Sequence, residues 1–229
     1  MNIAEVLKKK IESNQTVLTE FESKELLEEI GIIIPDQSLT SSKEETVSAA
    51  ERIGFPIVLK LIAEDIVHKS DTGAVKLNLK TKEDVEEAYD VLMKIPTQAE
   101  KKLSVQKMAD EPITELIIGM TTDPQFGPAL MFGIGGILVE LLEDVSFRIA
   151  PITDYDANEM IKEIKGFPIL DGYRGKPKAD LDAIVKTLLK ISDLVVKHEE
   201  INEMDLNPVF IYEKGLICVD ARIILKNQD

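Results

Sequence analysis

The chain has 229 residues, of which 44% are hydrophobic and 30% are charged, and its formal net charge is −15. That length fits one domain of two lobes or two small domains, with a core large enough to fold without disulfides or a structural metal. The acidic excess disfavours nucleic acid as a partner, because its phosphates would be repelled. A phosphate-bearing ligand would need local cations or Mg²⁺ to offset the overall negative charge.

The composition predicts a cytoplasmic protein. The single cysteine, Cys218, lies in an apolar run and allows no disulfide within the chain, as is usual in a reducing compartment. The first residues lack the basic and apolar blocks of a signal peptide, and no apolar run is long enough to span a membrane. We therefore expect no membrane partner.

The first half of the chain predicts a small lobe of helices and strands. Capping residues and helical spacing of apolar side chains indicate helices at about 3–11, 19–30, 43–53 and 83–94. Apolar runs at 57–62 and 74–79 indicate two strands on either side of a polar loop.

A different pattern begins near residue 102. Strands are expected at about 103–108, 113–121, 129–132, 137–142 and 147–152, joined by Gly or Asp turns that are typical of an antiparallel sheet. Helices at about 155–164 and 180–197 follow, and then strands near 201–205, 208–212 and 216–219. We predict an α+β fold with two subdomains, residues 1–105 and 106–229.

One loop combines a lysine with one of the two histidines. Lys60 ends an apolar strand, and His68 follows in a polar loop that runs to Gly73. Loop N–H groups and an ammonium are donors that surround phosphate, and a neutral imidazole can accept a phosphoryl group. Taken alone, a surface hairpin with a solvated histidine fits equally well.

Hard oxygen ligands occur near the C-terminus. Asn207 and Asp220 lie on adjacent strands of an apparent hairpin, and an amide oxygen with a carboxylate suits Mg²⁺ that keeps its other positions for water and phosphate. Arg222 shares the strand face of Asp220 and is placed to meet phosphate. Taken alone, these residues fit an Asn-Pro turn and an Asp–Arg surface pair better; together with Lys60 and the His68 loop, they favour the site.

Asp205 should face the same way as Asn207, two residues further on. A carboxylate beside an imidazole fixes its tautomer and stabilises the imidazolium, so we couple Asp205 to His68 as a hypothesis. The other histidine, His198, is far away in sequence and there is no Cys/His cluster, which disfavours zinc.

The junction of the two lobes offers groups for a nucleotide base. Gln106, Lys107 and Met108 lie there, where a hinge can present backbone groups and the Met side chain to an adenine ring. Glu115, one strand on, can accept hydrogen bonds from ribose hydroxyls. These assignments rest on spacing.

The chain resembles the beta subunits of archaeal-type ADP-forming acetyl-CoA (acyl-CoA) synthetases, ATP-grasp proteins related to the beta chain of succinyl-CoA synthetase. The resemblance spans about 16–225. It rests on blocks in order: PIVLK (56–60), HKSDTGAVKLN (68–78), DPQFGPALMFGIGGILVELLEDVSFRIAPIT (123–153), FPILDGYRG (167–175), EMDLNPVF (203–210) and VDARI (219–223).

The resemblance implies an ATP-grasp fold whose subdomains clamp ATP or ADP, with the phosphohistidine loop in the first and the Mg²⁺-binding strands in the second. By the same resemblance, Lys60 would bind the nucleotide phosphates, Gln106 to Met108 would line the adenine end, and Glu115 would bind the ribose. Asn207 and Asp220 would hold Mg²⁺. His68 would be the phosphorylated histidine, and Asp205 its supporting carboxylate.

The implied activity couples acyl-CoA, ADP and phosphate to free acid, CoA and ATP. An alpha subunit that carries the CoA site would be the partner, in a heterotetramer of two alpha and two beta subunits. Two alternatives stay open at this stage: a stand-alone ATP-grasp carboxylate ligase and a non-enzymatic nucleotide-sensing module.

Overall fold

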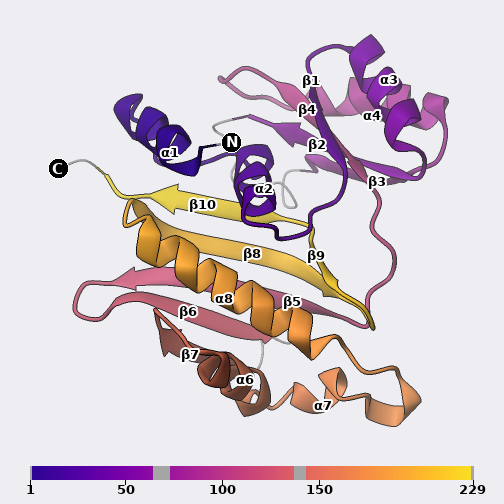
Figure 1. Ribbon diagram of the computed structural model, residues 1–229. Helices are drawn as coiled ribbons and strands as arrows, with labels where there is room; N and C mark the ends of the chain where they lie inside the picture. Colours follow the sequence, from indigo (N-terminus) through magenta and orange to yellow (C-terminus); the bar gives the residue numbers. More distant parts are fainter. Residues whose placement is uncertain (1, 64–72, 137–142, 228–229) are drawn as a thin grey trace. The chain divides into compact units, whose positions relative to one another are not determined.

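The computed structural model describes residues 2–63, 73–136 and 143–227 (Figure 1). His68 and the strand expected at 137–142 lie outside the described residues. The chain divides into two compact units, one of residues 35–110 and one that combines residues 1–34 with 111–229. The predicted mixture of helices and antiparallel sheets is confirmed.

The unit of residues 35–110 is a four-stranded antiparallel sheet with two helices on one face. The strands β1 (Gln37–Thr40), β2 (Ile57–Ile62), β3 (Val75–Leu79) and β4 (Lys102–Lys107) lie in the order β1-β4-β2-β3. The helices are α3 (Lys43–Ile53) and α4 (Lys82–Leu92). Their apolar faces bury one side of β2 and β4, and the shared core includes Val47, Ala50, Leu59, Leu61, Val85, Leu103 and Val105.

Capping side chains set where these two helices begin. The Ser42 hydroxyl accepts a hydrogen bond from the Glu45 N–H at 3.2 Å, and the Thr81 hydroxyl accepts one from the Asp84 N–H at 3.1 Å. The Asp84 carboxylate in turn accepts from the Thr81 N–H at 3.0 Å, which completes a capping box. These caps satisfy N–H groups that no helical carbonyl can reach.

The second unit is a six-stranded antiparallel sheet. Its strands are β5 (Thr114–Asp123), β6 (Gly127–Ile134), β7 (Val145–Ile149), β8 (Ile201–Ile211), β9 (Leu216–Cys218) and β10 (Ala221–Leu225). The order is β10-β8-β5-β6-β7, and β9 also pairs with β8. The helical segments are α6 (Asp154–Glu163), α7 (Phe167–Leu170), η1 (Tyr173–Gly175) and α8 (Leu181–Lys197).

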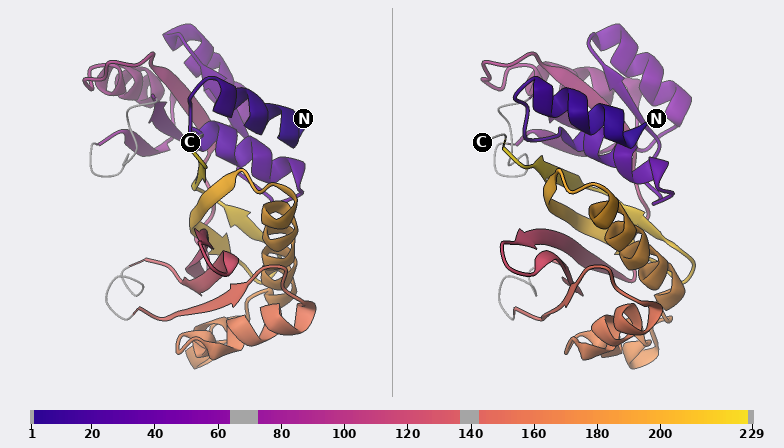
Figure 2. Two further views of the ribbon diagram at one scale, coloured as in Figure 1. Left: turned by 90° about the vertical axis from the view of Figure 1, so that its left-hand side faces the viewer. Right: turned by 60° about the vertical axis from the view of Figure 1, so that its left-hand side comes forward.

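The long helix α8 runs along one face of this sheet (Figures 1 and 2). Its apolar side contributes Leu188 and Ile191 to a core that also contains Ile118, Phe132 and Leu206 of the strands. Because side chains alternate along a strand, the residues between these core positions lie on the opposite face. We call that face the open face of the sheet.

The first 34 residues belong with this second unit and not with the lobe that follows them. The helices α1 (Ile3–Glu12) and α2 (Glu20–Glu29) flank a short extended segment that pairs with β10. In that pairing the Leu18 N–H donates to the Ile223 carbonyl at 3.0 Å. The unit boundaries therefore fall at 34/35 and 110/111, whereas the sequence indicates one boundary at 105/106, because local patterns do not reveal a pairing between distant segments.

Several further elements depart from expectation. The strands expected at 201–205 and 208–212 are one continuous strand, β8, although Asn207-Pro208 lies inside it. The strand expected to carry Asp220 and Arg222 is observed as β10, which begins at Ala221, and the short elements β1, α7 and η1 are not predicted by the sequence pattern. No helix in the described part of the chain is long and apolar enough to cross a membrane.

Candidate nucleotide and metal site

A polar row lies on the sheet of the first unit. Lys60 of β2 pairs in register with Ser104 of β4, and Gln106 lies two residues further along β4. Their neighbours in sequence point into the helix-covered core, so these three side chains share the opposite face. The Gln106 Nε2 donates to the Ser104 Oγ at 2.9 Å.

The Lys60 side chain of this row is deeply buried. Lys60 is only 4% exposed, and a charge removed from water is attracted to an anion more strongly than a solvated one. The sequence predicts nucleotide-binding roles for Lys60 and Gln106 but not for Ser104. The sequence does contain a sign of this: Ser104 lies two residues before Gln106 on a predicted strand, and residues two apart on a strand share a face.

Lys107 and Met108 tie the end of β4 to a neighbouring turn. The Lys107 Nζ donates to the carbonyls of Gly54 and Phe55, both at 2.9 Å. The Met108 N–H donates to the Pro56 carbonyl at 3.1 Å. The Lys107 ammonium therefore binds carbonyls of its own unit. The groups of this segment that these bonds do not use are the Met108 side chain and the remaining backbone groups.

Acidic and basic side chains meet on the open face of the six-stranded sheet. Asp205 of β8 pairs in register with Arg222 of β10 on one side and with Gly119 of β5 on the other. Asp205 and Asn207 are exposed, whereas Met204, which precedes Asp205 on β8, is buried in the core. The predicted common orientation of Asp205 and Asn207 is consistent with this alternation.

A β-bulge explains how an Asn-Pro pair fits inside β8. The register between β5 and β8 shifts between Leu116 and Ile118, so that Asn207 and Pro208 together oppose one residue of β5, Ile117. The bulge re-aims the chain, as bulges beside functional sites often do. It also leaves the Pro208 carbonyl and the Asn207 N–H directed at the segment that leads into β10.

Backbone hydrogen bonds bring Asp220 next to Asn207. The Asn207 N–H donates to the Asp220 carbonyl at 3.2 Å, and the Val219 N–H donates to the Pro208 carbonyl at 3.0 Å. The sequence placed these two residues on adjacent strands of a hairpin. Asn207 does lie on β8, and Asp220 lies between β9 and β10, which both pair with β8.

The electrostatics of this cluster reflect two nearby carboxylates. Burial of its surroundings raises the pKa of Asp205, the negative charge of Asp220 raises it further, and the positive charge of Arg222 lowers it. Asp205 itself keeps contact with solvent, which moderates the burial effect. Among the described residues, the Arg222 Nε is a buried donor without a hydrogen-bond partner, which suits it to an anionic ligand.

Glu115 lies on β5 beside the glycine run that ends β6. Its backbone carbonyl accepts a hydrogen bond from the Gly135 N–H at 2.7 Å. A Cβ on Gly135 would come within 3.1–3.3 Å of the backbone of residues 115 and 116, so only glycine fits there without a shift. In register Glu115 pairs with Phe210, two residues beyond the bulge.

The donors near Asn207 fit Mg²⁺ better than a metal that needs a full protein cage. No group of three or more His, Cys, Asp or Glu side chains that could hold a metal occurs among the described residues. An amide oxygen and a carboxylate are nevertheless a suitable pair for Mg²⁺, which keeps most of its positions for water and phosphate oxygens.

One more charged pair adjoins this cluster and was missed by sequence reasoning. Lys24 and Glu20 of α2 form a buried ion pair at 3.2 Å. The available signal was a lysine four residues after a glutamate, with Leu27 three residues later on the same face of an amphipathic helix. Such a lysine is ordinarily expected to reach solvent.

Comparison with known proteins places the chain in a family. A family model described as an ATP-grasp domain matches residues 9–225. Over 228 residues the chain is 46% identical to the beta subunit of acetate–CoA ligase (ADP-forming) II of Pyrococcus furiosus, covering 96% of this chain and 97% of that one. It is 47% identical to acetate–CoA ligase (ADP-forming) II of Archaeoglobus fulgidus, a longer protein of which it spans 30%.

A solved structure matches nearly the whole chain. Acetyl-coenzyme A synthetase 1 of Ca. Korarchaeum cryptofilum is 44% identical with a TM-score of 0.86, covering 97% of this chain and 99% of that one. That protein is in complex with coenzyme A and Mg-AMPPCP, and its phosphohistidine segment points towards the nucleotide-binding site. The present chain belongs to the ATP-grasp family, among the beta subunits of ADP-forming acetate–CoA ligases.

Proposed function

We propose that this chain is the nucleotide-binding beta subunit of an ADP-forming acyl-CoA synthetase, which converts acyl-CoA, ADP and phosphate into free acid, CoA and ATP. The observation that carries the proposal is the match to beta subunits over nearly the whole length of both chains. The cluster of Asp205, Asp220 and Arg222 beside Asn207 supplies the charged groups that such chemistry needs.

The proposed carrier of the phosphoryl group is His68. An imidazole nitrogen attacks the phosphoryl group of a phosphorylated donor on the alpha subunit, so that a P–N bond forms as the bond between phosphorus and the donor breaks. The P–N bond breaks in turn when an oxygen of the ADP β-phosphate accepts the group. Asp205 stabilises the imidazolium and orients the ring. A histidine carried on a loop can serve two distant sites without releasing a hydrolysable acyl phosphate to water.

The remaining groups position the nucleotide. Lys60 and Arg222 bind phosphate oxygens, Gln106 to Met108 contact the adenine end, and Glu115 accepts hydrogen bonds from the ribose. Asn207 and Asp220 hold Mg²⁺, which when bound offsets the charge of the phosphates. Phosphoryl transfer depends on such positioning and charge neutralisation more than on covalent chemistry by the protein.

The proposed partner is an alpha subunit with the CoA-binding domains, in a heterotetramer of two alpha and two beta subunits. Support comes from the relatives: one is itself a beta subunit, and another is a single longer chain of which this sequence spans 30%. A cytoplasmic location stays a prediction from the composition.

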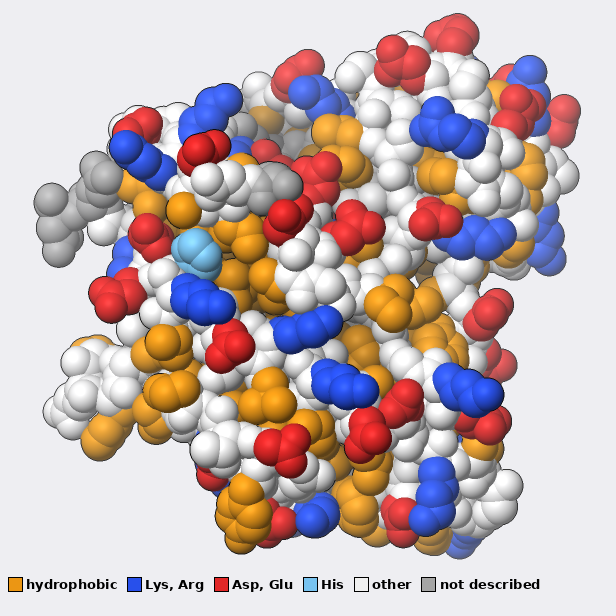
Figure 3. Space-filling view, in the orientation of Figure 1, with side chains coloured by type: hydrophobic (Ala, Val, Ile, Leu, Met, Phe, Trp, Pro, Cys, Tyr) orange, Lys and Arg blue, Asp and Glu red, His pale blue; other side chains and the backbone are white. Residues whose placement is uncertain are grey.

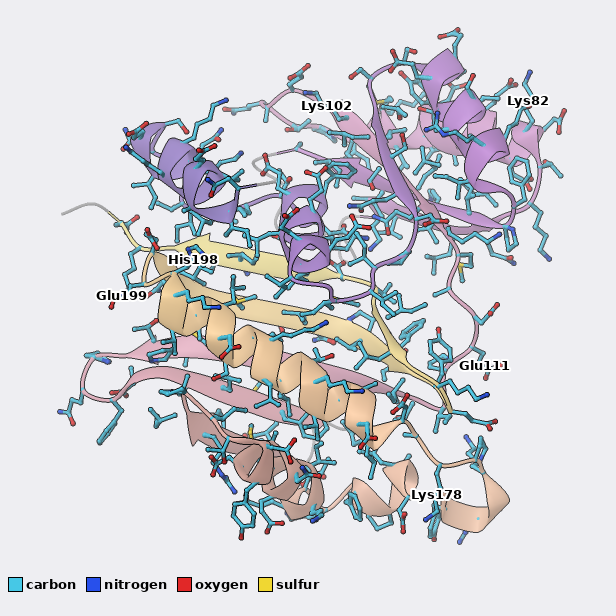
Figure 4. All side chains as sticks on the ribbon, in the orientation of Figure 1. Lys82, Lys102, Glu111, Lys178, His198 and Glu199 are labelled. Atoms are coloured by element: carbon cyan, nitrogen blue, oxygen red, sulfur yellow. The ribbon has the colours of Figure 1, made fainter. Side chains whose placement is uncertain are left out.

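Mass spectrometry after incubation with Mg-ATP tests the carrier. We expect one acid-labile, base-stable phosphoryl group on the wild type and none on His68→Ala. The matched control is His198→Ala, because His198 is the other histidine of the chain and caps the C-terminal end of α8 (Figure 4). Failure to label wild type even with alpha subunit, acyl-CoA and phosphate would overturn the carrier.

The same variants separate the alternative functions. A stand-alone ATP-grasp carboxylate ligase needs no histidine carrier, so His68→Ala would keep most of its turnover. A nucleotide-sensing module would bind ADP but transfer no phosphoryl group with the alpha subunit present.

A further inference from the structure

A buried ion pair lies next to the proposed metal-binding segment. The Lys24 Nζ is 3.2 Å from the Glu20 Oε1, and the exposed fractions of the two side chains are 0% and 2%. Lys24 is among the largest fully buried side chains in the described residues. Burial of two charges carries a desolvation cost that a well-packed apolar pair would avoid, so packing alone does not account for it.

The ammonium of this pair also binds the backbone that carries Asp220. The Lys24 Nζ donates to the Val219 carbonyl at 3.3 Å. That carbonyl belongs to the peptide group that joins Val219 to Asp220. This hydrogen bond joins residues 195 positions apart in the sequence. It restricts the orientation of the peptide group that precedes Asp220 and therefore the direction of the Asp220 side chain.

Other bonds hold the same short segment from different sides. The Cys218 N–H donates to the Ile33 carbonyl at 2.9 Å, which again ties it to the first 34 residues. The Asp220 carbonyl accepts from the Asn207 N–H at 3.2 Å and from the Cys218 Sγ at 3.3 Å. The lysine adds a charged donor to this set, and charge-assisted hydrogen bonds are the stronger kind.

We propose that Lys24, held in place by Glu20, is a positioning residue that sets the Asp220 carboxylate for binding the Mg–nucleotide complex. This inference rests on the proposed role of Asp220 as a Mg²⁺ ligand. Groups that orient metal ligands typically change metal affinity by about 10–100-fold when they are removed. The helix α2 thereby contributes to the metal site although it holds no proposed ligand.

The test variant is the double substitution Glu20→Gln/Lys24→Met, which removes both charges of the buried pair together. The matched control is Lys10→Met/Glu22→Gln, which removes the neighbouring pair between α1 and α2, 19% and 29% exposed. A Gln at position 22 can still serve the capping box of α2. A second variant, Lys24→Arg, keeps the positive charge and a donor.

Two quantities are measured on each full-length variant: binding of Mn²⁺ to the ADP-bound protein by electron paramagnetic resonance, and the unfolding temperature without metal or nucleotide. We expect the test variant to bind Mn²⁺ about tenfold or more weakly than wild type, and the control to bind it as wild type does. Lys24→Arg should restore part of the affinity. The unfolding temperatures of the test and control variants should differ from each other by little.

Asp220→Asn separates this inference from the function on which it rests. If Asp220→Asn leaves Mn²⁺ binding unchanged, the proposed metal site itself is wrong. If Asp220→Asn weakens binding and the Glu20→Gln/Lys24→Met variant does not, the positioning role of Lys24 is wrong and the pair is only structural. If the test variant does not fold, Lys24→Arg is compared with wild type alone: weaker Mn²⁺ binding at a similar unfolding temperature would support the inference, and unchanged binding would reject it.

Discussion

Lys60 is the residue whose proposed role is most open to a direct test. Its side chain is buried on the polar face of the sheet of β1 to β4, beside Ser104. Lys60→Met keeps the length and the burial but removes the charge. We expect phosphoryl transfer between ATP and the chain to fall by roughly 100-fold, the effect of removing one preorganised electrostatic donor.

The control for Lys60→Met is Lys76→Met. Lys76 lies on the adjacent strand β3 and pairs with Leu59, which places it on the opposite face of the same sheet. Rates are measured by quenched-flow transfer of labelled phosphate at saturating Mg²⁺, with urea midpoints to confirm folding. Equal losses in the two variants would show that Lys60 acts through the sheet and not on the nucleotide.

At this scale the sequence predicted residue types and their spacing but not their surroundings. Asp205 and Asn207 were placed on one face by their separation of two, and the exposure pattern of β8 agrees. The pairing of Asp205 with Arg222 depends on the register of two strands that are far apart in sequence, so spacing did not reveal it. The burial of Lys24 depends on α2 packing against β10, which is equally non-local.

The sequence predicts the helices well because the residues that cap a helix lie next to it in the sequence. Asp180, for example, was expected to begin the helix that is observed as α8, and its carboxylate accepts from the Ala183 N–H at 3.0 Å. It also accepts from the Gly215 N–H at 2.8 Å, a bond that no local pattern contains. The continuous strand β8 was missed for the same reason, because Asn-Pro ordinarily ends a strand and only the pairing with β5 accommodates it as a bulge.

The two bonds of Asp180 give a pH-dependent prediction. The Gly215 hydrogen bond lowers the pKa of Asp180, opposed by burial and assisted by the Ala183 bond. A carboxyl group with a lowered pKa in the folded state stabilises the protein above its unfolded pKa and loses that contribution as the pH falls. Asp180→Ala should therefore cost about 1–2 kcal/mol at pH 7.

The difference between wild type and Asp180→Ala should shrink as the pH falls below the ordinary aspartate value of about 3.9. Urea unfolding at pH 7 and at pH 3 measures it. Asp182→Ala is the control, because Asp182 also lies in the first turn of α8 but is not its cap. A cost that is independent of pH would mean that the charge of Asp180 plays no part.

The pairing of β6 with its neighbours predicts different tolerances for two glycines. A Cβ on Gly133 would lie 2.8 Å from the Asp144 carbonyl oxygen and 2.9 Å from Val145, both on the chain entering β7. A Cβ on Gly119 would first meet the end of the flexible Met131 side chain at 3.0 Å. Backbone cannot yield as a methionine can, so Gly133→Ala should destabilise by about 1–3 kcal/mol and Gly119→Ala by less.

Thermal or urea unfolding of Gly133→Ala and Gly119→Ala checks this order. Asp205 pairs with Gly119, so nucleotide binding is measured in parallel to separate stability from the site. If Gly119→Ala is destabilised more than Gly133→Ala, the Met131 side chain is unable to move aside for the added methyl group.

The surface shows the same mixture of charged and apolar side chains that the composition contains. On the face seen in Figure 3, acidic and basic side chains of the described residues are interspersed and apolar side chains lie between them. The family match supplies what composition alone cannot, because an acidic α+β protein of this size is compatible with many functions.

The division of the chain is the property of the whole molecule that the sequence predicted least well. Residues 35–110 form one compact unit with its own core, whereas residues 1–34 find their partners in β9 and β10. A fragment of residues 35–110 should therefore unfold cooperatively in urea. A fragment of residues 1–110 should unfold at the same midpoint, because its first 34 residues lack the segments that they pair with.

Hydrogen exchange locates the difference between the two fragments. In the full chain the Leu18 amide is bonded to the Ile223 carbonyl and should be protected, whereas in the 1–110 fragment it should exchange like an unfolded residue. The amides of β2 and β4 should be equally protected in both fragments, since their partners lie within residues 35–110. Protection of residues 16–34 in the 1–110 fragment would instead support the contiguous N-terminal subdomain that the sequence pattern indicates, and would mean that pairing with β10 is not what orders the N-terminus.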